Sequence, residues 1–188
     1  VNALNTNIGG IKTSGYDLAA NYTFDLTDFG LPDFGGFSVS YIGTFLNELV
    51  TDPGVAAPYD CAGFYGNACS SGTNGGVPNP EYRHNARVVW QTPINLDLTG
   101  TWRYFGEVAL FGNTANRVDA VLEGQHYFDL AASYRLNDMA SFRAGVNNVF
   151  DDDPPLSASV GTSGNGNTYP QSYDAFGRYF FAGVTLDF

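Results

Sequence analysis

The strongest constraint on this chain is an alternation of apolar residues with polar or small ones, repeated in many short segments. From Tyr16 to Leu26, for example, every second residue is apolar. Successive side chains of a β-strand point to opposite faces, so this pattern predicts strands with one apolar face. The predicted strands cover residues 11–26, 37–46, 81–91, 95–105, 125–136, 140–150 and 173–188. A separate short strand over residues 1–8 is the alternative, because Gly9 and Gly10 can form a hairpin turn.

The composition favours a membrane β-barrel over a soluble fold. No run approaches the ~20 apolar residues that a spanning helix needs. Aromatic residues nevertheless reach 15%, and charged residues are only 14%. A soluble β-sandwich also has short alternating strands, but it needs more charge on its outer surfaces. The expected fold is therefore all-β: an antiparallel transmembrane β-barrel, here a partial barrel of about seven or eight strands.

The connections between the predicted strands alternate between short and long. Bacterial outer-membrane barrels have short periplasmic turns and long extracellular loops. The last strand would then end at the periplasm, and the first of seven strands would begin outside. A complete barrel has both termini in the periplasm, so we expect this chain to be part of a larger barrel. The predicted short turns are 27–36, 92–94 and 137–139, and the long loops are 51–80, 106–124 and 151–172.

The last residues resemble the terminal assembly signal of outer-membrane barrels. In that signal a Gly, a hydrophobic residue and a terminal Phe recur at fixed offsets, which Gly183, Leu186 and Phe188 match. Phe181 departs from the pattern, which usually has a polar residue there. The resemblance implies that the barrel-assembly machinery reads this end of the chain.

Two further stretches resemble the TonB-dependent outer-membrane receptors. One consists of the sequence NNVFDDDPP, which begins at Asn147, followed after a loop by a strand that starts with Gly, Arg and an aromatic residue. The matching residues are Asn148, Val149, Phe150, Asp151, Gly177, Arg178 and Tyr179. The other is the Gly-hydrophobe-acid sequence Gly15, Tyr16 and Asp17. The resemblance implies that residues 1–188 are the C-terminal segment of a plugged barrel of about 22 strands, with the plug domain absent from this chain.

The resemblance also implies a location and partners. The location would be the outer membrane of a Gram-negative bacterium. The partners would be outer-membrane lipid, the plug domain and remaining barrel, and the TonB energy-coupling protein acting through the missing N-terminal part. The ligand would be a scarce small-molecule nutrient, either siderophore-bound iron or a carbohydrate. The alternative is a small structural or adhesion-type barrel without transport. Loop aromatics that could stack on either ligand are Tyr59, Phe64, Tyr65, Phe111 and Tyr169.

The remaining candidate sites are a cysteine pair and a set of charged residues. Cys61 and Cys69 share one predicted outer loop, where an oxidising compartment favours a disulfide over a metal site. A net charge of −11 argues against nucleic acid. No cofactor motif or catalytic constellation is present, so we expect no enzyme. The alternation predicts a lumen-facing set, because charge is tolerated in a wet interior: Asp17, Arg83, Arg87, Asp97, Arg103, Asp129, Arg135 and Arg143.

Overall fold

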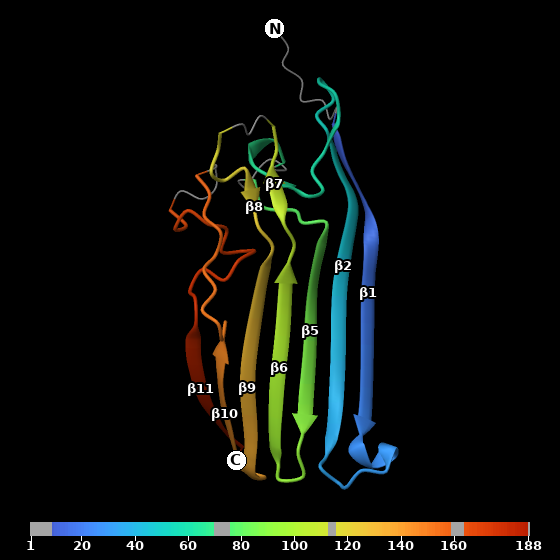
Figure 1. The fold of residues 1–188 in the computed structure, drawn as a ribbon, viewed down its shortest axis with the longest axis vertical. Coiled ribbons are helices and arrows are strands. Elements are labelled where there is room, and N and C mark those ends of the chain that lie inside the picture. The colour runs from blue at the N-terminus through green and yellow to red at the C-terminus, as the bar shows by residue number, and fades with distance from the viewer. Residues whose placement is uncertain (1–8, 70–75, 113–115, 159–163, 188) are drawn as a thin grey trace.

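The computed structural model describes residues 9–69, 76–112, 116–158 and 164–187, and its main feature is one long antiparallel sheet (Figure 1). Each long strand pairs with the next long strand along the chain, without a crossover. A two-residue strand, β3 (Tyr59–Asp60), adds to the end of β2. In sheet order the long strands are β1 (Gly10–Asp25), β2 (Gly36–Asp52), β5 (Tyr82–Gln91), β6 (Leu96–Phe105), β9 (Gln125–Asn137), β10 (Ala140–Asn147) and β11 (Tyr179–Leu186).

This arrangement confirms the predicted antiparallel, all-β fold with seven long strands. The three short turns lie at one end of the sheet and the long connections at the other (Figure 1). We call these the turn end and the loop end. The alternative strand over residues 1–8 lies outside the described residues. None of the described helices is long and apolar enough to cross a membrane.

Three strands differ by three or more residues from the predicted bounds. β10 ends at Asn147 rather than at Phe150. β2 continues to Asp52, pairing with β1 beyond a register irregularity at Ser14 and Gly15. The final strand begins at Tyr179 rather than at Tyr173. Tyr173 is instead buried among the loops, with 2% of its surface exposed, and Gly177 has a positive φ of 66° that interrupts an extended chain. Residues 173–178 therefore do not form a strand, although their sequence alternates as a strand would.

The strand register separates the sheet into an apolar face and a polar face. One cross-strand row contains Phe24, Phe37, Trp90 and Leu98, and all four are apolar. Aromatic rings stack along the same face, such as Phe37 on Trp90 with 5.9 Å between ring centroids. The adjacent row, one residue nearer the turn end in each strand, contains Asp25, Gly36, Gln91 and Asp97. These four strands thus present the two kinds of side chain to opposite sides near the turn end.

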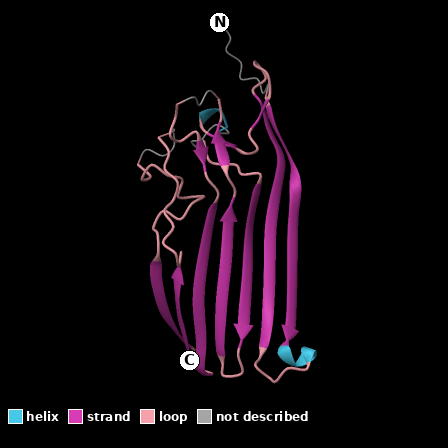
Figure 2. Ribbon diagram, viewed as in Figure 1, coloured by secondary structure: helices cyan, strands magenta, loops and turns pink. Residues whose placement is uncertain are grey.

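The buried hydrophobic core lies at the loop end, not under the sheet. A second, small sheet is formed there by β4 (Phe64–Tyr65), β7 (Val108–Leu110) and β8 (Val121–Leu122). Figure 2 shows the irregular segments gathered around it. A 3-10 turn, η2 (Asn67–Cys69), belongs to this region, and another, η1 (Leu26–Phe29), lies at the turn end. The core is made by Tyr65, Val108, Leu122, Tyr169 and Tyr173. The sequence predicts long loops without strands of their own, but the structure shows that these loops contain a small sheet.

Candidate functional site

The charged residues that the sequence groups together occupy the polar face. Rows of the sheet align Asp17 with Thr44 and Thr44 with Arg83, while Arg143 aligns with Ser133 and Ser133 with Asp97. By the same register, the face carries all eight members of the predicted set: Asp17, Arg83, Arg87, Asp97, Arg103, Asp129, Arg135 and Arg143.

Arg103 is the best-connected charge on the polar face. Its Nε donates to Asp129 Oδ2 at 2.7 Å and its Nη2 to Asp129 Oδ1 at 2.9 Å, which makes a bidentate pair. Nη2 also donates to Asp174 Oδ2 at 3.2 Å, from the loop that precedes β11. The guanidinium carbon lies 5.1 Å from the ring centroid of Tyr127, a buried neighbour. These contacts fix the loop at Asp174 onto the sheet.

The other arginines of this face are not paired within the described part of the chain. Arg83, Arg87, Arg135 and Arg143 make no ion pair with a described residue. The Arg143 guanidinium lies over the Phe181 ring, 5.0 Å from its centroid, in a cation–π arrangement. The face therefore offers cationic groups to whatever lies against it.

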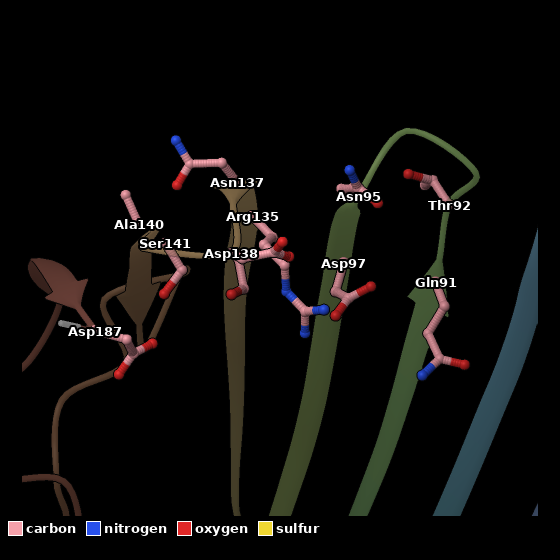
Figure 3. A pocket seen from close by; sticks show the side chains of 11 residues that line it. Gln91, Thr92, Asn95, Asp97, Arg135, Asn137, Asp138, Ala140, Ser141 and Asp187 are labelled. Carbon is pink, nitrogen blue, oxygen red and sulfur yellow. The ribbon is translucent and has the colours of Figure 1, made fainter.

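Three hollows follow one another along the polar face. The first, of about 340 Å³, lies at the loop end, between the side chains of Arg83, Arg103 and Tyr127. The middle one, of about 460 Å³, includes Arg87 and Arg143. The third, of about 520 Å³, lies at the turn end, and Figure 3 shows Asp97, Arg135 and Asp187 among the side chains that line it. All three are open. The middle and turn-end hollows carry both acidic and basic side chains, whereas the first is lined by two arginines and no acidic residue.

The residues that resemble the TonB-dependent receptor motif, 148–151 and 177–179, connect the end of β10 to the start of β11 by hydrogen bonds. We call this connection the latch. Asn148, fully buried, donates from its backbone N to Asp129 Oδ1 and exchanges two hydrogen bonds of 2.9 Å with the backbone of Asp152. Asp151 Oδ1 accepts from Arg178 N at 2.7 Å. The Arg178 guanidinium also reaches the carbonyl oxygen of Val149 at 3.2 Å. The motif thus holds the two ends of a long loop together.

The loop at β3 carries the two cysteines. The structure joins Cys61 and Cys69 in a disulfide, and both residues are buried. Asp60, just before the bridge, accepts from the backbone N of Leu49 and of Ala62, both at 2.9 Å. This loop is therefore fastened to β2 as well as to itself.

Asp119, in the loop between β7 and β8, is a buried acid with several hydrogen-bond partners. It is 3% exposed and accepts a bidentate hydrogen bond from Arg117, at 2.8 and 2.7 Å. Its carboxylate also accepts from Ser157 Oγ and Ala158 N, and its carbonyl oxygen accepts from the Tyr65 hydroxyl. The hydrogen bonds from Arg117 first, and then those from Ala158 and Ser157, lower the pKa of Asp119 to about 2 despite its burial. Sequence reasoning missed Asp119, because nothing in its local pattern separates it from a solvated loop acid.

Two of the loop aromatics predicted to stack on a ligand cannot do so in this arrangement. Tyr65 and Tyr169 are 0% exposed, and their rings meet edge-on with centroids 5.9 Å apart. Burial raises the pKa of Tyr169 to about 12. Tyr59 and Phe64 both pack against Phe111, at 5.3 and 5.5 Å between centroids. That prediction is wrong for the two buried tyrosines, because the loops fold on one another.

The predicted terminal signal is only partly visible. Gly183 pairs with Arg143 and Leu186 with Ala140, and Leu186 is exposed. Phe188 lies outside the described residues. Among the described residues, no three His, Cys, Asp or Glu side chains gather in a way that could hold a metal ion.

The fold defines a class. The long antiparallel sheet leaves the large side chains of its apolar face exposed, and short turns join its strands at one end. This is the form of a membrane β-barrel wall. A family model described as "TonB dependent receptor-like, beta-barrel" matches residues 1–149, and the chain belongs to this family. Members of the family are outer-membrane receptors of Gram-negative bacteria, and it is not a family of enzymes.

Solved structures support the same fold. The chain is similar to the ferric-catecholate import receptor Fiu of E. coli, with 21% identity, a TM-score of 0.59, and coverage of 96% of this chain and 21% of that one. A structure of the ferric enterobactin receptor PfeA of Pseudomonas aeruginosa gives 18% identity, a TM-score of 0.54, and coverage of 94% and 22%. Another PfeA structure, in complex with enterobactin, gives 19% identity, a TM-score of 0.54, and coverage of 94% of this chain and 23% of that one. The chain thus spans about a fifth of each receptor's length. A comparison with curated protein sequences returned no match.

Proposed function

We propose that this chain forms the C-terminal part of the barrel of a TonB-dependent receptor that takes up a scarce small-molecule nutrient across the outer membrane. The observation that carries the proposal is the separation of the sheet into an apolar and a polar face, in a chain that belongs to this family. The apolar face lies against lipid, and the polar face lines the lumen. Transport requires the remaining barrel and the plug.

In this arrangement the partners contact different parts of the sheet. The remaining barrel strands pair with β1 and β11, the two outer strands of the described sheet, because open edges are not tolerated in lipid. The plug domain lies against the polar face, where its acidic groups meet the arginines that make no ion pair with a described residue. The TonB protein acts through the plug, and the barrel-assembly machinery reads the C-terminal strand.

The ligand is a siderophore-bound iron or a carbohydrate, and an iron chelate is the first to test. The similar solved structures are named as ferric-catecholate and ferric enterobactin receptors, although at this identity they support only a shared fold. Tyr65 and Tyr169 are buried and cannot face the ligand. The candidate ligand-facing features of this segment are therefore the half-buried aromatics Tyr59, Phe64 and Phe111 and the hollow near Arg83 and Arg103.

The membrane placement is tested by putting a charge on each face of β9 in the intact receptor. Leu130→Arg places the charge at mid-strand on the apolar face, and Ser133→Arg places it on the polar face between Asp97 and Arg143. A lipid-facing Arg near the midplane costs about 2–4 kcal/mol. We expect Leu130→Arg to lower the amount of folded, heat-modifiable receptor and Ser133→Arg to leave it near normal. Similar amounts of the two variants would contradict the placement.

The uptake activity is tested in cells that lack the gene for the intact receptor. Radiolabelled ferric enterobactin is one probe and a labelled oligosaccharide mixture is the other. We expect accumulation of one probe to return with the restored gene and to be lost again when TonB is deleted. Accumulation that does not need TonB, or that neither probe shows, would contradict the proposed uptake of these ligands.

A further inference from the structure

The turn between β1 and β2, taken together with the first residue of β2 as residues 26–36, is held by hydrogen bonds but exposes three large apolar side chains. Asp28 Oδ2 accepts from the backbone N of Asp25 at 3.0 Å, and Leu26 N donates to the carbonyl oxygen of Gly35 at 3.2 Å. Yet Phe29, Leu31 and Phe34 are 63%, 51% and 56% exposed. Holding three such side chains in water within a fixed turn is unfavourable, so a contiguous exposed group of this kind marks a contact surface.

Two contacts place this turn against the apolar face. The Phe29 ring meets Phe24 edge-on, with 5.6 Å between centroids, and Trp90 Nε1 donates to the carbonyl oxygen of Phe34 at 2.9 Å. Phe24 and Trp90 belong to the apolar row nearest the turn end, and Phe37 stacks between them at 5.5 and 5.9 Å. The turn therefore extends an aromatic band that already runs across three strands.

We propose that residues 26–36 form a foot that inserts Phe29, Leu31 and Phe34 into the headgroup boundary of the membrane leaflet at the turn end. The inference rests on the membrane placement proposed above and goes beyond the uptake function. Continuity with the aromatic band identifies the occupant as lipid, because aromatic and aliphatic side chains partition into this boundary when joined to an apolar surface.

The charge of the foot selects among lipids. Residues 26–36 contain Asp28 and Asp33 and no Lys or Arg. An acidic segment is repelled by anionic headgroups and attracted by an ammonium group. The foot therefore favours a zwitterionic phospholipid such as phosphatidylethanolamine over phosphatidylglycerol or cardiolipin. The other two turns at this end each expose a single large apolar side chain, Ile94 and Met139, whereas the foot exposes three.

The test is site-specific photocrosslinking of the intact receptor in its own outer membrane. A benzophenone amino acid replaces Phe29 or, in a second variant, Leu31. The same group at Leu130, mid-strand on the apolar face, is the positive control, and at Gln91, on the polar face, the negative control. After illumination, the folded receptor is isolated by its heat-modifiable mobility and its adducts are identified by mass.

We expect lipid adducts at positions 29 and 31 at a yield similar to that at position 130. Position 91 should give about tenfold fewer, because water and protein replace lipid on that face. Phosphatidylethanolamine should exceed its share of the membrane lipid among the adducts at positions 29 and 31. If the position 29 variant does not assemble, the position 31 variant decides.

Three results would overturn the foot. Lipid adducts at position 130 but none at positions 29 and 31 would remove it and leave the membrane placement intact. No lipid adduct at position 130 would remove both. A protein adduct at position 29 in place of lipid would assign the surface to a protein partner. An excess of anionic lipid adducts would overturn the charge preference.

Discussion

Gly177 shows how one residue of the motif serves the latch between β10 and β11. Its φ of +66° is costly for any residue with a Cβ. A Cβ at this position would also lie 2.9 Å from Asp151 Oδ1, the atom that accepts from Arg178 N. That oxygen cannot move away without losing its hydrogen bond. The Gly-Arg pair is thus explained by backbone geometry, without a contact to a ligand.

We therefore expect Gly177→Ala to destabilise the intact receptor by about 1–2 kcal/mol, the usual penalty for a left-handed backbone. The measurement is thermal unfolding in detergent, followed by the loss of heat-modifiable mobility. Gly10→Ala is the matched control, because no atom lies within 4 Å of its added Cβ and its φ is not positive. Equal midpoints for the two variants would contradict the role of Gly177.

Asp119 gives a pH dependence to the loop end. Its folded pKa of about 2 lies below the unfolded value of 3.8, so the ionised form stabilises the loops. The contribution is complete above the unfolded pKa and is lost as the pH falls through the folded pKa. We expect hydrogen exchange of residues 117–122 to rise as the pH falls from about 4 to about 2, after correction for intrinsic exchange.

Asp119→Asn should remove this acid step and raise exchange already at neutral pH, because the charge-assisted bonds from Arg117 are weakened. Asp153→Asn, which changes an exposed acid of another loop, is the control and should behave as the wild type. An unchanged acid step in Asp119→Asn would assign the step to another group.

At the scale of elements, the disulfide fastens the loop that carries β3, β4 and η2. Bridging residues eight positions apart removes unfolded-state freedom worth about 2–3 kcal/mol in the chain-entropy model. The double variant Cys61→Ser/Cys69→Ser should therefore be cut faster by protease within residues 53–80, while the long strands stay protected. Surface proteolysis of intact cells measures this difference. Equal cleavage of variant and wild type would show that the packing of Phe64 and Phe111 holds the loop without the bridge.

The long strands could be predicted from the sequence, but the loop end could not. β5, β6 and β9 carry their signal locally, because the alternation itself states which side chains share a face. The small sheet depends on contacts between distant segments: β4 pairs with β7 in parallel, and Tyr65 packs on Tyr169. Two-residue strands have no period to detect. Contacts between distant segments also explain why the sequence predicts the start of β11 too early. Tyr173 fits the alternating pattern of a strand, but it is buried in the loop before β11.

The site was predictable to the same extent. Alternation alone grouped Arg83, Arg103 and Asp129 on one face, because that grouping needs only the register. It could not find Asp174, which reaches Arg103 from a loop 71 residues further along the chain. Nor could it separate the paired Arg103 from the arginines that lack an ion pair within the described residues. Pairing depends on loop placement, which the alternation does not encode.

At the scale of the whole molecule, the terminal strand has two roles that a substitution can separate. β11 is an edge of the described sheet and pairs only with β10. In the intact barrel its other edge closes against the first strand, because open edges are not tolerated in lipid. If the terminal signal is read during assembly, Phe188 acts before any of these contacts form. Its removal would then change the yield of folded receptor more than its stability.

Burying a Phe side chain contributes roughly 1.5–3 kcal/mol, and less at a chain end, so packing alone predicts a mild effect of Phe188→Ala. The signal hypothesis predicts a sharp loss of receptor inserted in the outer membrane. Asp187→Asn is the matched neighbour, because it keeps the backbone bond from Asp187 N to the carbonyl oxygen of Met139 and alters only a carboxylate in the polar hollow at the turn end. We expect it to insert normally. The measurement is the amount of surface-exposed, heat-modifiable receptor at matched expression, together with the unfolding midpoint of whatever inserts. A low yield with a nearly normal midpoint for Phe188→Ala supports the signal, whereas equal yields of the two variants would remove it.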